Sequence, residues 1–246
     1  MMTPTTSRSL RRVFTSSGTF TAPNDGWYKV IALSGGGNGG NGAGASGSSQ
    51  YAGGGGASGS IAISWVYLLA NTNVSTTITT TTTAAGSGNN VSFGTYLTVA
   101  GGEGGTNATA SAVGQGGRSA HSVSVLRPTV QDTFGVGAAQ SKSIEENFEK
   151  EILPYFIPVG FKMRTQSATN MTEVSAQTSR GGDGGTGNSA NSTQTGIGAG
   201  GPGGGGFKVI GQGITVYGAG GNGANRTGGT DNSRGNGTAG IIIVEG

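Results

Sequence analysis

The chain has 246 residues, of which 53 are glycine and none is cysteine, and its 14 basic and 11 acidic residues give a net charge of +3. Without cysteine there is no disulfide framework and no thiolate metal site. Glycine averages about 7% in ordinary proteins, so the glycine content of this chain lies far outside the usual range. The length suits one domain, or one domain with an insertion.

Order is expected despite the composition. Low hydrophobicity with abundant glycine often indicates disorder. Here charged residues make up only 10% of the chain, so self-repulsion does not expand it, and strand-like segments separate the glycine runs. The start of the chain carries no apolar stretch typical of a signal peptide, and no apolar run approaches the roughly 20 residues that span a bilayer. We therefore expect synthesis in the cytoplasm without a leader.

The N-terminal residues 1–12 are expected to form a polar arm, which contains Arg8, Arg11 and Arg12. Nucleic-acid binding is not expected, because no aromatic residue lies among these basic residues. Strands follow at 13–15 and 18–21. A turn is predicted at 23–26, because Asn-Asp-Gly tolerates positive φ.

Further strands are predicted from apolar patterning. Residues 27–33 are apolar on both faces, which indicates a buried strand. Residues 61–67 alternate, with Ile61, Ile63, Trp65 and Tyr67 on one face. The remaining strand predictions rest on β-branched or apolar runs and cover 74–83, a pair around Gly94 within 91–99, and 207–210, 214–217 and 241–244.

Four glycine-dense stretches separate these strands, at about 35–59, 101–117, 181–206 and 218–240. Glycine has the largest backbone entropy to lose on folding, so an ordered glycine run needs compensation. A bundle of polyproline-II segments would provide it, because glycine allows neighbouring backbones to touch and to exchange hydrogen bonds. Collagen is excluded, since the Gly-x-y period is not kept and proline is scarce.

The range 122–180 differs and is predicted to be an inserted subdomain. Ser143 to Glu146 is a capping-box signature, and Pro154 would end the helix. One short helix cannot build its own core, so we expect its apolar stripe and the patch that follows to contact a partner or another copy through Ile144, Phe148, Ile152, Tyr155, Phe156 and Phe161.

Catalytic groups are sparse. The only histidine, His121, follows a glycine stretch and lacks the strand-turn-helix context of a nucleophile elbow. Four carboxylates lie on the predicted helix, and we interpret them as a solvated face. Adjacent helical residues do not face each other, so these side chains are not expected to form a catalytic acid pair. They are Glu145, Glu146, Glu149 and Glu151. An acid pair assembled in three dimensions stays open, so a hydrolase is not formally excluded. We predict no catalytic residues, no metal and no cofactor.

A short glycine motif at Gly35 to Gly40 matches the pattern of a dinucleotide-binding loop. That loop requires a helix directly after it. The residues that follow, 41–59, continue as glycine, alanine and serine. The motif is therefore interpreted as a product of composition.

The order of these elements resembles the glycine-rich domains of bacteriophage tail fibre and tail tip proteins. The resemblance rests on Ser17-Gly18-Thr19-Phe20-Thr21-Ala22-Pro23, on the buried strand that runs into Gly35-Gly36-Gly37, and on the closing strand Gly240-Ile241-Ile242-Ile243-Val244-Glu245. It covers about 13–118 and 181–246. The pattern is also similar to T-even distal fibre adhesins with a polyglycine-II sandwich, and to the glycine-rich domain of certain receptor tyrosine kinases.

The resemblance implies an all-β fold with polyglycine-II. Jelly-roll-like antiparallel sheets would frame a bundle of glycine-rich segments over 13–121 and 181–246, and 122–180 would add one short helical subdomain. It further implies a virion protein of a phage tail that presents loops to a host receptor. Carried over by position, the receptor-binding residues would be Ser48, Ser49, Gln50, Tyr51, Asn225, Arg226, Thr227, Asp231, Asn232 and Arg234.

The expected partners are other tail proteins and a bacterial surface receptor, either an outer-membrane protein or a glycan. A homotrimer or a trimeric fibre is expected, and no nucleic acid. Two alternatives stay open. One is a non-adhesive minor tail, baseplate or capsid decoration protein, and the other is a protein outside phages or a cryptic hydrolase.

Overall fold

A computed structural model describes residues 10–44, 50–79, 85–118, 123–125, 130–136, 155–159, 163–167, 170–174, 189–190, 197–198, 206–224, 226–227, 230–231 and 234–246. Every strand pairing in this part of the chain is antiparallel. The described residues contain no helix, and hence no helix that could cross a membrane. The expectation of an all-β, antiparallel fold is confirmed.

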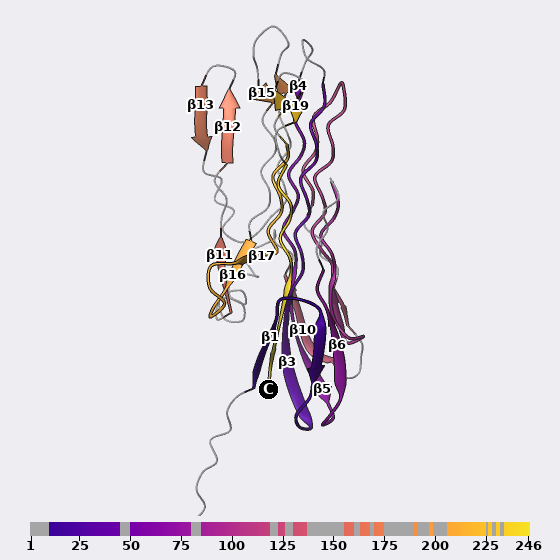
Figure 1. The fold of residues 1–246 in the computed structure, drawn as a ribbon. Helices are drawn as coiled ribbons and strands as arrows, with labels where there is room; N and C mark the ends of the chain where they lie inside the picture. The colour runs from indigo at the N-terminus through magenta and orange to yellow at the C-terminus, as the bar shows by residue number, and fades with distance from the viewer. Residues whose placement is uncertain are drawn as a thin grey trace, which may run out of the picture.

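Two five-stranded sheets pack face to face at one end of the molecule and form a sandwich (Figure 1). The first sheet has the order β1 (Arg11–Phe14), β20 (Ile241–Glu245), β3 (Gly26–Leu33), β5 (Ile61–Leu68) and β10 (Val130–Val136). The second has the order β2 (Gly18–Thr21), β6 (Asn73–Thr77), β7 (Val91–Phe93), β8 (Leu97–Val99) and β9 (Val123–Val125).

Strand β3 is buried on both faces from Val30 to Leu33, as its apolar run predicts, whereas Trp27 near its start is exposed. Val30 and Ala32 point into the sandwich, where they pack with Phe93 and other apolar side chains of the second sheet. Ile31 and Leu33 point the other way. Their face is covered by a third sheet of three short strands, β11 (Phe156–Val159), β16 (Gly206–Val209) and β17 (Val216–Tyr217).

Several local expectations are confirmed. Residues 23–26 form the turn into β3, and Gly94 joins β7 to β8 with φ of +52°, a conformation that favours glycine. The alternation along β5 is also confirmed, because its exposed positions are Trp65 and Tyr67. The strand expected at 214–217 is shorter, since Ile214 lies in the turn before β17.

The ends of the expected domains differ from the structure. Strand β1 begins at Arg11 and pairs with β20, so the last two residues of the expected arm belong to the sheet. Within the range 122–180, β9 extends the second sheet and β10 covers the edge of β5. This range therefore contributes strands to the sandwich itself. The predicted helix, with Ile144, Phe148 and Ile152, lies outside the described residues.

The described glycine-dense segments within 34–60, 101–118 and 218–240 run side by side away from the sandwich as extended columns (Figure 1). The column at 34–41 is the central one. Every third amide of this column donates to the same neighbouring stretch. Ser34, Gly37 and Gly40 donate to the carbonyls of Ser60, Ala57 and Gly54. The same column exchanges hydrogen bonds with five other stretches, which are 54–60, 85–89, 102–108, 221–224 and 235–238.

Close approach of backbones explains why these positions are glycine. A Cβ on Gly36 or Gly39 would overlap the carbonyl of Ala219 or Asn222, and one on Gly37 would overlap that of Glu103. Among the described residues, the only glycines with positive φ are Gly44, Gly94, Gly211, Gly213 and Gly218. The column glycines are therefore required by the space between backbones and not by a left-handed conformation.

The columns end in short strand pairs at the far end of the molecule (Figure 1). These strands are β4 (Gln50–Tyr51), β14 (Ser189–Ala190), β15 (Ile197–Gly198), β18 (Arg226–Thr227) and β19 (Thr230–Asp231). A separate hairpin is formed by β12 (Met163–Ser167) and β13 (Asn170–Val174).

Candidate functional site

The two loops predicted to bind a receptor meet at the far end of the columns. Strand β4 belongs to the first predicted loop and β18 to the second, and the two strands are in contact although they are far apart in sequence. Strand β4 pairs with β14, while β18 pairs with both β15 and β19. We name this group of five strands, β4, β14, β15, β18 and β19, the tip.

The structure places the predicted receptor-binding residues as follows. Gln50 and Tyr51 form β4, Arg226 and Thr227 form β18, and Asp231 ends β19. The register sets Arg226 opposite Asp231 in a tight hairpin. Ser48, Ser49, Asn225 and Asn232 lie outside the described residues.

Tyr51 connects the tip to the columns, and Arg234 lies at the end of a column. The backbone of Tyr51 exchanges two hydrogen bonds with Ala43, of 2.8 and 2.9 Å, and thereby joins β4 to the end of the central column. The guanidinium of Arg234 donates to the side-chain oxygen of Asn236 at 2.6 Å. The next residue, Gly235, accepts a hydrogen bond from the amide of Gly39. Both predicted loops are thus fixed at their base by the ordered backbone of the columns.

None of the five tip strands was predicted as a strand, and two of them, β14 and β15, also lie outside the predicted binding loops. They lie in the glycine-dense stretch 181–206, where Ser189-Ala190 and Ile197 interrupt the glycine runs. A short non-glycine segment within a glycine run is also the signal shared by the residues predicted at 48–51, 225–227, 231–232 and 234. Applied to every such segment, it would have found β14 and β15 as well.

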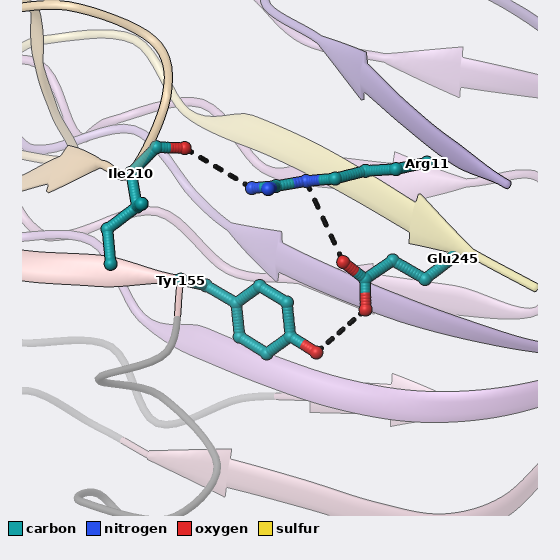
Figure 2. A network of polar contacts seen from close by, with 4 residues as sticks. All are labelled: Arg11, Tyr155, Ile210 and Glu245. Carbon is teal, nitrogen blue, oxygen red and sulfur yellow. Dashed lines mark hydrogen bonds and ion pairs between the residues drawn. The ribbon is translucent and has the colours of Figure 1, made fainter. Parts of the chain in front are cut away.

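Tyr155, a predicted partner-interface residue, makes contacts within its own chain (Figure 2). Its hydroxyl donates to a carboxylate oxygen of Glu245 at 2.7 Å, and the Lys29 ammonium lies 5.1 Å from the centre of its ring. The other carboxylate oxygen of Glu245 lies 3.7 Å from the guanidinium of Arg11, which also donates to the carbonyl of Ile210. This network attaches the third sheet to the first.

Burial raises the pKa of Tyr155 above its ordinary value of 10.0, and the hydrogen bond to Glu245 raises this pKa further. The positive charge of Lys29 opposes the shift. The hydroxyl therefore keeps its proton, and its role as donor to Glu245, throughout the neutral pH range.

The described residues offer no phosphate cradle at the short glycine motif. A phosphate-binding loop needs free backbone amides that point at the ligand. All six amides from Gly35 to Gly40 donate to carbonyls of other columns. In the described part of the chain, no group of three or more histidine, cysteine, aspartate or glutamate side chains gathers as a metal site would require.

Comparison with known proteins adds one finding. A family model described as a glycine-rich domain matches residues 15–246, which include every strand of the sandwich except β1, together with the columns and the tip. No curated protein sequence matches the chain.

Proposed function

The chain belongs to the glycine-rich domain family, and we propose that it is a non-catalytic component of a phage tail, fibre or tail tip, whose tip binds a receptor on the host cell surface. The observation that carries the proposal is the convergence of the two predicted loops at the end of the columns. Recognition residues commonly lie on loops that a rigid scaffold positions.

The direction of the molecule supports this role. The backbones of Leu10 and Gly246 exchange hydrogen bonds at the end of the sandwich that lies opposite the tip (Figure 1). A support attached to the sandwich would leave the tip pointing outward. The columns would then act as a stiff spacer between the support and the receptor.

We further propose that the columns are polyglycine-II helices. Hydrogen bonds that recur every third residue fit a polyproline-II-like helix, which has three residues per turn. A central column with neighbours on all sides fits a bundle of such helices, because each turn directs its amides to different neighbours. The jelly-roll-like connectivity and the inserted helix remain predictions.

Binding of purified protein to host cells, in competition with intact phage, tests the adhesive role. We expect saturable binding that blocks phage adsorption. Tyr51→Ala and Arg226→Ala should weaken binding without changing thermal unfolding. The control for Arg226 is Arg12→Ala, because Arg12 is exposed on β1 at the sandwich end.

A second function, a non-adhesive minor tail, baseplate or decoration protein, predicts a different result. Assembled protein would then fail to bind cells, and tip substitutions would leave virion infectivity unchanged. Equal loss of binding in Arg12→Ala and Arg226→Ala would also contradict the adhesive role of the tip, since the two positions lie at opposite ends.

A further inference from the structure

The five stretches around the central column form a ring that is open at one place. Neighbouring stretches of the ring are joined by direct backbone hydrogen bonds at four junctions. Between 85–89 and 235–238, all of whose residues are described, the structure has no such bond. We name this open junction the seam. The bonded junctions run from the amide of Gly88 to Gly102, from Gly54 to Thr106, from Gly56 to Gly221 and from Gly235 to Asn222.

The central column directs one of its three side-chain positions per turn into the seam. A Cβ on Gly35 would lie 3.4 Å from backbone atoms of both Asn89 and Thr238, which belong to opposite sides of the seam. A polyproline-II-like column has three residues per turn, so the next position in this direction is Asn38. The seam is therefore where the bundle has room for a side chain.

Asn38 bonds to both sides of the seam. Its backbone amide donates to the carbonyl of Gly86 at 2.9 Å. Its side-chain oxygen accepts a hydrogen bond from the amide of Gly237 at 2.6 Å. The residue is fully buried, which is uncommon for asparagine. It is also the one residue other than glycine in the short motif at 35–40.

We propose that the side chain of Asn38 locks the seam and holds the stretch 235–238 against the rest of the bundle. That stretch leads from the predicted loop at 225–234 back to β20, so the lock also fixes the base of this loop. The proposal does not depend on receptor binding, because it concerns contacts within the columns.

Asn107 provides a matched control. Its side-chain oxygen also accepts from a column amide, that of Asn41 at 2.8 Å, but this contact is exposed and does not cross the seam. Asn38→Ala removes the acceptor of the Gly237 amide in a buried place, so we expect Tm to fall by about 5 °C or more. Water can replace the exposed contact, so Asn107→Ala should lower Tm by less than about 2 °C. Calorimetry of the full chain measures both.

The width of the seam can be measured directly. The chain contains no cysteine, so spin labels attach only where cysteine is introduced. Ser87 and Asn236 are exposed and lie on opposite sides of the seam. With labels at Ser87→Cys and Asn236→Cys, we expect Asn38→Ala to lengthen and broaden the distribution of distances between the labels. Asn107→Ala should leave it unchanged. The measurement is made well below Tm, so it separates an open seam from a general loss of stability.

Asn38→Asp gives a conservative test. Aspartate has nearly the same shape and keeps the acceptor oxygen, but burial disfavours its charged form and raises its pKa above the ordinary value of about 3.9. The charged residues nearest on the surrounding stretches already have partners. Glu103 accepts from the amide of Arg118, and Arg234 donates to Asn236.

Because the folded-state pKa of this aspartate is raised, the variant keeps its stability at low pH and loses it as pH rises through that pKa. Relative to the wild type, we expect a similar unfolding constant near pH 4 and one at least about tenfold larger at pH 7. Urea unfolding of both proteins at the two pH values measures this difference.

Three outcomes would overturn the proposal. The first is an equal loss of Tm in Asn38→Ala and Asn107→Ala. The second is an unchanged distance across the seam in Asn38→Ala or, if that variant does not fold, in Asn38→Asp at pH 7. The third is a penalty for Asn38→Asp that is the same at pH 4 and pH 7.

Discussion

At the scale of single residues, glycine allows neighbouring columns to approach each other at backbone contact distance. The amide of Gly39 donates to Gly235, while its α-carbon lies against the carbonyl of Asn222. Both neighbours are backbone, so no flexible side chain can move aside. The space left by the missing Cβ is therefore occupied by another column.

Gly39→Ala tests this directly. The added methyl group must displace backbone atoms. We therefore expect the free energy of unfolding to fall by about 3 kcal/mol or more, which corresponds to a Tm lower by about 6–12 °C. The control is Gly26→Ala, where a Cβ would meet nothing within 4 Å. Calorimetry of both variants is the measurement, and equal stabilities would contradict tight packing of the columns.

Tyr155 gives a second prediction at this scale. Its pKa is raised in the folded state, so the unfolded chain loses this proton first as pH rises. Stability from this group is complete below pH 10 and declines as pH rises from there through the folded-state pKa. Tyr155→Phe should cost about 1 kcal/mol at neutral pH and should flatten the decline above pH 10. Denaturant unfolding of both proteins between pH 8 and 11 measures the difference.

At the scale of elements, the junction between strand and column depends on Ser34. This buried side chain donates to the carbonyl of Ala100 at 2.6 Å and accepts from the amide of Ser60 at 2.8 Å. Ser34→Ala would leave two buried backbone groups without this partner, which should cost about 1–3 kcal/mol. Ser75→Ala, on the exposed outer face of β6, should change stability by less than about 0.5 kcal/mol. Comparable losses in the two variants, measured by urea unfolding, would contradict this role.

Elements were predictable wherever the local pattern alone decides them. The two-sided apolar run of β3, the alternation in β5 and the turn around Gly94 are local signals, and the structure shows all three. Strands β9 and β10 were missed because their places are set by partners distant in sequence, at Leu97–Val99 and Ile61–Leu68. Propensity carries no information about such partners.

The tip was likewise predictable only where local sequence decides the structure. Interruptions of the glycine runs marked β4 and β18 in the sequence, but nothing local indicated that these segments meet. Their meeting depends on the columns, whose hydrogen bonds fix how far each stretch runs beside the central one. The contacts of Tyr155 with Glu245 and Lys29 were unpredictable for the same reason, because 90 residues separate the hydroxyl from its acceptor.

At the scale of the whole molecule, the columns should behave as one cooperative unit. The central column has no hydrogen bonds between its own described residues at 35–40, since their amides all donate to other stretches. Loss of one column removes partners from all its neighbours. Amides at 35–40 should therefore exchange with solvent as slowly as those of β3, although these residues belong to no strand or helix.

Hydrogen exchange followed by mass spectrometry on wild type and Gly39→Ala would measure this cooperativity. We expect the substitution to reduce protection in 54–60, 102–108, 221–224 and 235–238 together, because each exchanges hydrogen bonds with the central column. Protection in β6, β7 and β8 should fall much less, since those strands are held by the sandwich core. If protection were lost only around position 39, each column would unfold independently of the others. The columns could then not serve as a stiff spacer for the tip.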